Sequence, residues 1–417
     1  MNIPSFFRSA FIYTSSNLIN ALIPILLLPF LTAYLSKEDY GIVALFQVMV
    51  MILLPFVGFS ASAAIERGYY ENRDFPPYVT NGIYLVGITG GAFLLAALVF
   101  NRFLGGLTDF PAEYFWTIPL YCICQNASEI VLSYWRLKNQ AVQYGMFRIG
   151  RTILEVGLSI TLVAVYSKGW IGRMDAMAVS MGLFSILALL VLYKKNLLAG
   201  GARKKDIQGI ARFGAPLIPH VLGGIIMVYS DRIFITKMVG LAETGSYTVG
   251  YQVAMAISLL QSSFNLAWVP WFYSKLNQND ETIKLKIVKF TYLYNVLILM
   301  CAIGLTLVAP LIFKVFINKN YNDSIQFVWW VALGFAFDGM YKMKVSYLFY
   351  LKKTHIVSVV TFGVAILNLI LNYFLIKSFG AIGAAQATAI CLFCEYVIIW
   401  MVSARMYKMP WLYFMGK

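Results

Sequence analysis

Charged residues are scarce in this chain. Of its 417 residues only 12% are Asp, Glu, Lys or Arg, whereas 60% are hydrophobic. An ordinary soluble domain carries about 25% charged residues, and a single hydrophobic core stops growing near about 250–300 residues. A soluble fold of this length cannot cover so much apolar surface. Lipid can cover it, so the composition predicts an integral membrane protein.

Residues that commonly build catalytic or metal centres are also rare. The chain has two histidines, and its five cysteines all fall within long apolar segments, so we expect neither a disulfide framework nor a metal site. Cys391 and Cys394 form a C-x-x-C pair, which we interpret as two small buried apolar residues. No G-x-x-x-x-G-K-[ST] loop occurs, which argues against ATP hydrolysis by this chain. We expect no cofactor.

Long, unbroken apolar segments run through the whole chain. A backbone in lipid must satisfy its own hydrogen bonds, which leaves helices or closed barrels, and these segments lack the alternation of barrel strands. Windows of about 20 apolar residues predict twelve transmembrane helices. They lie near Phe11–Leu35, Ile42–Ile65, Val79–Phe100, Tyr114–Tyr134, Phe147–Tyr166, Ala176–Tyr193, Ile210–Lys237, Tyr247–Phe272, Phe290–Phe313, Phe327–Tyr350, Val357–Ile376 and Ile382–Met401.

Lysine and arginine are distributed unequally between the two sets of loops. With both termini on one side, most of the 33 basic residues, Arg8 among them, fall on that side, while Arg173 and a few others fall in loops on the opposite side. Because basic loops stay in the cytoplasm, both termini are predicted to be cytoplasmic and the membrane to be a bacterial inner membrane. Topology and anionic lipid explain most of the +15 net charge. No folded module suggests nucleic-acid binding.

The two halves of the chain share short patterns. The basic stretch from Lys194 to Gly209 is interpreted as a linker between an N-terminal lobe, residues 1–198, and a C-terminal lobe, residues 199–417. Phe30, Thr32 and Gly41 recur as Phe234, Thr236 and Gly245, and Gly169-x-x-Gly172 recurs as Gly380-x-x-Gly383. Six spans per half insert in the same orientation. We therefore predict an all-α membrane protein with two parallel-repeat six-helix bundles around a central cavity; shared loop patterns without common ancestry are the alternative.

Two longer blocks resemble a known family. The stretches Phe213-Gly-Ala-Pro-Leu-Ile-Pro219, Ser230-Asp-Arg-Ile-Phe-Ile-Thr236 and Ile366-Leu-Asn-Leu-Ile-Leu-Asn372, and the segment that continues to Ala385, are similar to bacterial polysaccharide-unit flippases. These are the O-antigen (Wzx-type) transporters of the multidrug/oligosaccharidyl-lipid/polysaccharide exporter superfamily. Two features depart from the pattern: Gln386 stands where an apolar residue is expected, and no extra pair of helices is present.

The resemblance implies a function in surface polysaccharide or lipopolysaccharide biosynthesis. The substrate would be an undecaprenyl-diphosphate-linked oligosaccharide, flipped from the cytoplasmic to the periplasmic leaflet by alternating access. Without an ATP-binding loop, an ion gradient of protons or sodium remains as the internal energy source. Membrane lipids, a polysaccharide polymerase and glycosyltransferases would be partners, and nothing in the chain demands more than a monomer.

Ionisable residues within the predicted spans are the candidates for function, since each costs about 2.5–3.5 kcal/mol on insertion. Arg151 with Glu155, and Asp338 with Lys342, are i,i+4 pairs on one helical face. The alternative is that each pair only neutralises itself between helices. Asp231 and Arg232 are adjacent, so their side chains point in different directions.

A cationic cavity suits a diphosphate, because an arginine fork matches phosphate oxygens and lysine acts as a point charge. The predicted substrate-binding residues are Arg151, Arg232, Lys342 and Lys344, with Arg67 and Arg148 at the cytoplasmic mouth. Lys344 has a second interpretation, in which its side chain extends to lipid headgroups. The predicted ion-coupling carboxylates are Asp231, Glu155, Asp338 and Glu395, because a desolvated carboxylate gains affinity for a proton.

Two other functions stay open at this point. A multidrug cation antiporter of the same superfamily would need an acidic cavity, whereas the unpaired intramembrane charges here are mostly basic. A membrane enzyme, such as a polysaccharide polymerase or ligase, would need a loop with a cluster of catalytic groups. No such cluster is evident, so the chain is not expected to be an enzyme.

Overall fold

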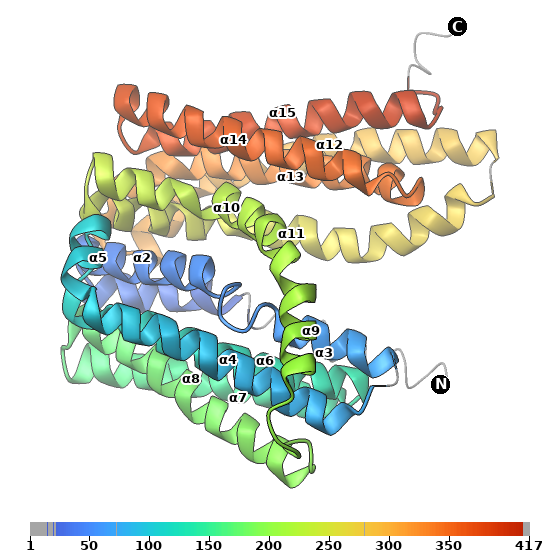
Figure 1. Cartoon of the computed structure of the whole chain (residues 1–417). Helices are drawn as coiled ribbons and strands as arrows, with labels where there is room; N and C mark the ends of the chain where they lie inside the picture. Colours follow the sequence, from blue (N-terminus) through green and yellow to red (C-terminus); the bar gives the residue numbers. More distant parts are fainter. Residues whose placement is uncertain (1–14, 16–19, 21, 72, 279, 412–417) are drawn as a thin grey trace, which may run out of the picture. The chain divides into compact units, whose positions relative to one another are not determined.

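The computed structural model describes residues 15, 20, 22–71, 73–278 and 280–411, and this part of the chain is helical with no strand. Arg8 and the beginning of the first predicted span lie outside the described residues. The chain forms two compact units, Met1–Ile225 and Ile226–Lys417 (Figure 1). Each unit is built from its own set of packed helices.

The first unit consists of an apolar helix, Leu22–Tyr34, followed by eight helices. They are α2 (Lys37–Leu53), α3 (Ala61–Tyr70), α4 (Phe75–Val99), α5 (Asn101–Thr108), α6 (Thr117–Leu137), α7 (Ala141–Ile160), α8 (Gly169–Lys194) and α9 (Lys204–Gly214). Helix α6 packs against α3, α4 and α8, and α7 packs against α8. Helix α10 (Ile218–Met238) begins in this unit and ends in the next.

The basic stretch after α8 belongs to the first unit. The Thr80 hydroxyl accepts a hydrogen bond from the backbone N–H of Ala199 at 2.9 Å, and the N–H of Arg203 donates to the Asn81 side chain at 2.7 Å. Helix α9 then packs on α3 and α4. The two compact units meet at Ile225 and Ile226, and the lobe boundary at residues 198 and 199 stays a prediction.

The second predicted span is interrupted rather than continuous. Helix α2 ends at Leu53 and α3 begins at Ala61. Pro55 between them has no N–H to continue the helix, and Gly58 adopts a φ of 77°, which glycine accepts without steric cost. The freed N–H of Gly58 donates to the hydroxyl of Thr89 at 2.8 Å. A polar side chain of α4 thus satisfies the backbone where the helix breaks.

The second unit is built around one central helix. Its helices are α11 (Leu241–Leu276), α12 (Glu281–Phe316), α13 (Ile325–Tyr350), α14 (Thr354–Phe379) and α15 (Ile382–Met406). Helix α13 packs against α11, α12 and α15, and α14 packs against α15 (Figure 1). The connections between consecutive helices are short, so helices that follow one another along the chain run antiparallel.

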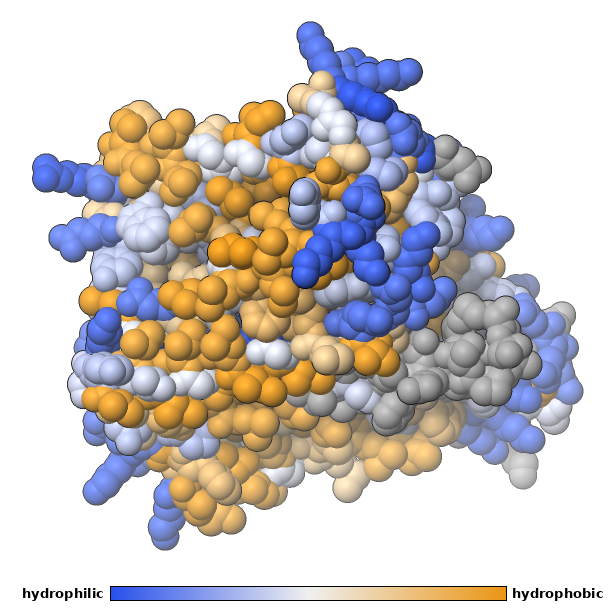
Figure 2. All heavy atoms as spheres, turned by 90° about the horizontal axis from the view of Figure 1, so that it is seen from below, coloured by the Kyte–Doolittle hydropathy of each residue, from blue (hydrophilic) through white to orange (hydrophobic). Residues whose placement is uncertain are grey.

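Six of the described helices are long and apolar enough to cross a membrane: α4, α8, α11, α12, α14 and α15. The pair formed by residues 204–217 and 221–238 counts as a seventh if it is one bent span. The other predicted spans correspond to helices that are shorter or more polar. Large hydrophobic side chains are exposed along these helices, for example Leu95 and Leu307 at 66% and 76%. On the face shown in Figure 2, hydrophobic side chains form a broad band and hydrophilic ones gather toward its ends.

This arrangement confirms the predicted fold class, an all-α membrane protein that crosses the bilayer several times. An outward hydrophobic surface of this extent would aggregate in water, while lipid covers it. The placement of the termini in the cytoplasm stays a prediction.

Candidate functional site

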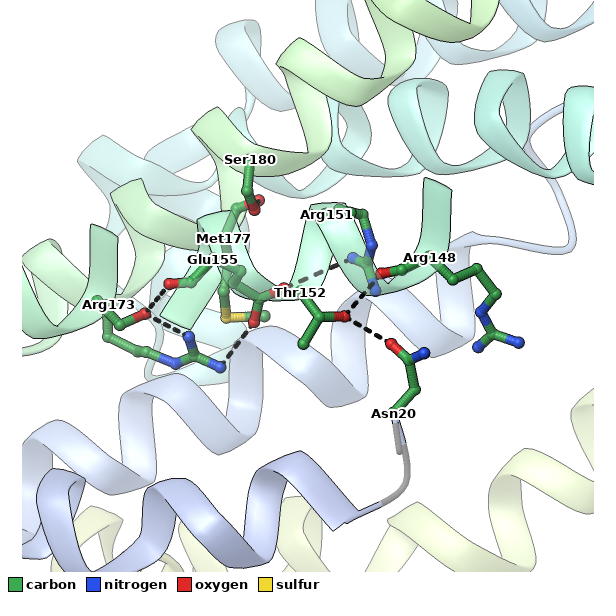
Figure 3. A network of polar contacts seen from close by, with 9 residues as sticks. Asn20, Arg148, Arg151, Thr152, Glu155, Arg173, Met177 and Ser180 are labelled. Atoms are coloured by element: carbon green, nitrogen blue, oxygen red, sulfur yellow. Dashed lines mark hydrogen bonds and ion pairs between the residues drawn. The ribbon is translucent and has the colours of Figure 1, made fainter. Parts of the chain in front are cut away.

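A network of polar side chains lies inside the first unit, on α7 and α8 (Figure 3). The Glu155 carboxylate is at its centre. Arg173 donates from Nη2 to Glu155 Oε1 at 2.9 Å, and Arg151 Nη1 lies 3.5 Å from Glu155 Oε2. The side chains of Arg173, Glu155 and Arg151 are 8%, 13% and 22% exposed. The predicted pair of Arg151 and Glu155 is therefore part of a three-residue network.

Arg173 lies in α8 rather than in a loop, contrary to its assignment from the sequence. Its residue is 6% exposed, and its Nη1 donates to the Ser159 hydroxyl at 2.6 Å. Gly172 makes this position possible, since a Cβ there would lie 2.9 Å from the backbone of Leu162. The close approach of α8 to the end of α7 lets Arg173 reach back to Glu155. Hydropathy alone had excluded this basic residue from the sixth span.

Two further residues extend the network toward the first predicted span. The Thr152 hydroxyl donates to Asn20 Oδ1 at 2.5 Å and contacts the backbone oxygen of Arg148 at 3.0 Å. The Arg148 side chain points away from Glu155 in Figure 3. Its Nη1 donates to the Tyr144 hydroxyl at 2.9 Å. Two guanidinium groups thus share one carboxylate, which leaves positive charge for an anionic ligand.

A second cluster lies in the second unit, around Asp231 of α10. The Asp231 carboxylate is fully buried. It accepts hydrogen bonds from the Tyr247 hydroxyl at 2.5 Å, from Asn372 Nδ2 at 3.0 Å and from the Thr388 hydroxyl at 2.9 Å. These donors come from α11, α14 and α15. Among the described residues no cation forms an ion pair with Asp231, so its hydrogen-bond donors are neutral, and the charge of Arg232 acts on it only from a greater distance.

Several uncharged oxygen atoms complete this cluster. Asn372 Nδ2 also donates to Asn368 Oδ1 at 3.0 Å, and the Ser230 hydroxyl donates to the same Oδ1 at 3.0 Å. The Oδ1 atom of Asn372 is buried without a hydrogen-bond partner in the part of the chain that is described. Carboxylate, amide and hydroxyl oxygens are the ligands that hard cations prefer. The cluster can hold a proton on the carboxylate or a small cation among its oxygens.

Arg232 shares Tyr247 with Asp231, and its other contacts are with different residues. It is 5% exposed. Its guanidinium carbon lies 4.4 Å from the ring centroid of Tyr251 and 5.6 Å from that of Tyr247. Its Nη1 donates to the backbone oxygen of Val228 at 3.1 Å. Cation–π contacts with aromatic faces therefore contribute to its stabilisation.

The structure places the other predicted residues at separate positions. Lys342 and Asp338 form the predicted pair at 2.9 Å, and Gln261 donates to the same carboxylate oxygen at 2.6 Å. Glu395 is buried and accepts from the Thr361 hydroxyl at 2.8 Å.

Arg67 and Lys344 differ in their exposure. Arg67, in α3, pairs with Glu71 at 2.6 Å and is 57% exposed, in agreement with an outward position. Lys344 is fully buried among aromatic rings and does not extend outward. The interpretation in which it reaches lipid headgroups with an extended side chain is not what the contacts show.

Sequence reasoning missed the uncharged members of both networks. They are Asn20, Thr152 and Ser159 in the first unit, and Tyr247, Asn368, Asn372 and Thr388 in the second. Asn368 and Asn372 carried a usable signal, because two amides at i,i+4 lie on one face of an otherwise apolar helix. Nothing in the sequence marked Tyr247 among 27 tyrosines.

One protein family and several known proteins are similar to this chain in sequence. The family described as polysaccharide biosynthesis protein matches residues 6–276. An uncharacterized membrane protein of Haemophilus influenzae is 27% identical over 85% of this chain and 86% of that protein. A Haloferax volcanii protein named "Probable low-salt glycan biosynthesis flippase Agl15" is 22% identical over 92% of this chain and 80% of that protein.

Solved structures share the fold at low sequence identity. An inward-facing multidrug resistance MATE family transporter of the MOP superfamily superposes with a TM-score of 0.72, at 14% identity over 94% of both chains. The lipid II flippase MurJ superposes with a TM-score of 0.71, at 13% identity over 96% of this chain and 91% of MurJ. The chain belongs to the polysaccharide biosynthesis protein family and has the fold of the MOP superfamily transporters, as the two sequence blocks predicted.

Proposed function

We propose that this protein flips an undecaprenyl-diphosphate-linked oligosaccharide, an O-antigen or similar surface polysaccharide unit, from the cytoplasmic to the periplasmic leaflet of the bacterial inner membrane. Both termini would lie in the cytoplasm, and the two lobes would alternate access to a central cavity. The family and the flippases among its relatives support a transporter rather than an enzyme.

One observation carries the assignment of an anionic substrate. In the first unit two buried arginines, Arg151 and Arg173, share a single carboxylate, Glu155. Arg173 is fixed by Glu155 and Ser159, whereas Arg151 lies at the longer distance of 3.5 Å from Glu155 and also contacts the Tyr121 hydroxyl. In this proposal Arg151, whose contact with Glu155 is the longer of the two, turns toward the diphosphate, whose oxygens an arginine binds bidentately. A cavity for cationic drugs would favour the opposite sign of charge.

A test of this assignment uses a deletion of the gene in its own host. The deletion should abolish surface polymer on gels and should accumulate diphosphate-linked intermediates on the cytoplasmic side. Replacing Arg151 by Gln removes a charge-assisted hydrogen bond worth about 1.5–3 kcal/mol, so flipping should fall about tenfold or more at equal expression. Arg102→Gln, at an exposed residue of the same unit, is the matched control and should restore wild-type polymer.

Two results would contradict the proposal. Undiminished polymer in the deletion strain would remove the flippase assignment. Resistance to cationic drugs conferred by the intact chain, without any effect on polysaccharide, would favour the multidrug antiporter instead.

We assign ion coupling to Asp231. Its carboxylate is fully buried and is bonded to neutral donors from three other helices, so a bound proton or sodium ion changes the charge at a point where α10, α11, α14 and α15 meet. A charge in such a site is costly unless it is paired. Loading and release of the ion would therefore change which packing of these helices is more stable.

Asp231→Asn tests this step, because the amide keeps the size of the side chain and removes its charge. In proteoliposomes the variant should bind substrate, while its flipping should no longer respond to an imposed proton or sodium gradient. Glu155, Asp338 and Glu395 are the other predicted coupling carboxylates, and Glu395→Gln is the comparison. A gradient response that survives in Asp231→Asn and disappears in Glu395→Gln would move the coupling site to α15.

A further inference from the structure

Lys344 is a fully buried lysine in the last third of α13. Aromatic rings of the same unit surround its ammonium group. The Nζ atom lies 3.5 Å from the ring centroid of Trp411, 5.0 Å from that of Trp400 and 5.9 Å from that of Tyr292. These rings come from the segment after α15, from α15 itself and from α12. Cation–π contacts of this kind are worth about 2 kcal/mol when desolvated, which is less than the cost of burying an unpaired ammonium.

The site contains donors without an acceptor. Lys344 Nζ, the indole Nε1 of Trp411 and the hydroxyl of Tyr347 are all buried, and none of them has a hydrogen-bond partner among the described residues. The three are neighbours, because Lys344 and Tyr347 lie one turn apart on α13 and the Tyr347 and Trp411 ring centroids are 5.9 Å apart. Each unmade bond costs about 1–3 kcal/mol. The missing component is a group that accepts hydrogen bonds and carries negative charge.

The position of the site points to lipid. Lys344 precedes the end of α13 at Tyr350 by six residues, about 9 Å at 1.5 Å per residue. This end of the unit, where α11, α13 and α15 finish and α12 and α14 begin, is strongly basic. It carries Lys275, Lys284, Lys286, Lys289, Lys352, Lys353, Arg405 and Lys408, against the acids Asp280 and Glu281. Such a surface attracts anionic headgroups.

The covering segment is short and held by few bonds. The Tyr292 hydroxyl donates to the backbone oxygen of Trp411 at 2.9 Å, and the Trp411 N–H donates to Met409 O at 2.8 Å. Residues 407–411 follow the last helix and are not themselves helical. Lifting this segment would uncover Nζ from the side facing the helix ends, while Lys344 stays fixed on α13.

We propose that Lys344, Tyr347 and Trp411 form a binding site for the phosphate of an anionic membrane phospholipid, enclosed by the segment of residues 407–411. The ammonium supplies the charge, and the indole N–H and the tyrosine hydroxyl orient the phosphate oxygens. This proposal assigns Lys344, which the sequence predicted to bind the substrate, to a lipid instead. It uses neither the arginines of the first unit nor Asp231, on which the proposed function rests.

The site is tested by measuring the affinity of the delipidated protein for a first lipid molecule by native mass spectrometry. The probes are dioleoylphosphatidylglycerol, the corresponding diacylglycerol, which lacks the phosphate, and inorganic phosphate alone. We expect phosphatidylglycerol to bind at least tenfold more tightly than diacylglycerol. Lys344→Met keeps the length of the buried chain and should remove this preference. Lys319→Met, at an exposed lysine beyond the opposite end of α12, should leave it within twofold of the wild type.

Tyr347→Phe provides a second variant if Lys344→Met does not fold. It removes one donor and keeps the ring, so the affinity for phosphatidylglycerol should fall about threefold while that for diacylglycerol stays constant. An unchanged preference in Lys344→Met would overturn the proposal, and it would indicate that the buried amine is neutral. Equal binding of the two lipids would overturn it as well. If inorganic phosphate alone saturates the site and abolishes the preference for phosphatidylglycerol, the ligand is a soluble anion and not a lipid, and the proposal is overturned.

Discussion

Neutralising Glu155 is the perturbation whose effect the structure defines most closely. Its carboxylate contacts two guanidinium groups, at 2.9 Å and 3.5 Å, and the Arg173 side chain is only 8% exposed. Removing one partner of a buried ion pair costs about 3–5 kcal/mol, because the other charge stays buried without compensation. Glu155→Gln retains one oxygen that can accept from Arg173. We therefore expect the free energy of unfolding to fall by about 3 kcal/mol, at the low end of that range.

Reversible unfolding in mixed micelles measures this change. Glu66→Gln is the matched control, since Glu66 pairs with Arg136 at 2.6 Å in the same unit but the two side chains are 36% and 41% exposed. Exposed pairs contribute at most about 1 kcal/mol. The double variant Glu155→Gln with Arg173→Met should recover much of the loss, because no buried charge then lacks a partner.

One result would refute this reasoning. If Glu155→Gln destabilises no more than Glu66→Gln, water or a bound anion compensates Arg173, and the network is not held by the carboxylate. A loss that the second substitution does not recover would lead to the same conclusion about Arg173.

Two further predictions concern packing and pH. Gly250→Ala should lower the free energy of unfolding by about 1–3 kcal/mol, because a Cβ there would lie 2.5 Å from the Ser324 backbone oxygen. Gly304→Ala should not destabilise, since a Cβ there would have no atom within 4 Å. The same unfolding experiment compares the two variants. The hydrogen bonds from Arg67 and Arg73 lower the pKa of Glu71 below 4.5. Its contribution to stability is therefore present above pH 4.5 and lost as the pH falls, so Glu71→Gln should weaken the acid dependence of the thermal midpoint, and an unchanged profile would contradict this.

The fold class followed from composition, because a chain with so few charges can bury its hydrophobic residues only in lipid, and a backbone in lipid must form helices. The family followed from two short blocks. Pairs at i,i+4, such as Arg151 with Glu155 and Asp338 with Lys342, were also predictable, since the helix repeat alone brings them together.

The sequence did not predict where charges on different helices meet. Arg173 follows a loop and was assigned to that loop, because hydropathy windows treat any basic residue near a span end as a boundary. Only the close approach at Gly172 places it against Glu155. For Lys344 the sequence left two positions open, and the packing of α12, α13 and α15 placed it under Trp411.

Local sequence thus determined that this chain is helical, where most helices lie and which neighbours along a helix pair. Tertiary structure alone decided the partners of Asp231, which come from α11, α14 and α15 and are uncharged. The physical reason is that helix periodicity is a local property. Contacts between helices depend instead on their close approach, which a few small residues and a break in one helix determine.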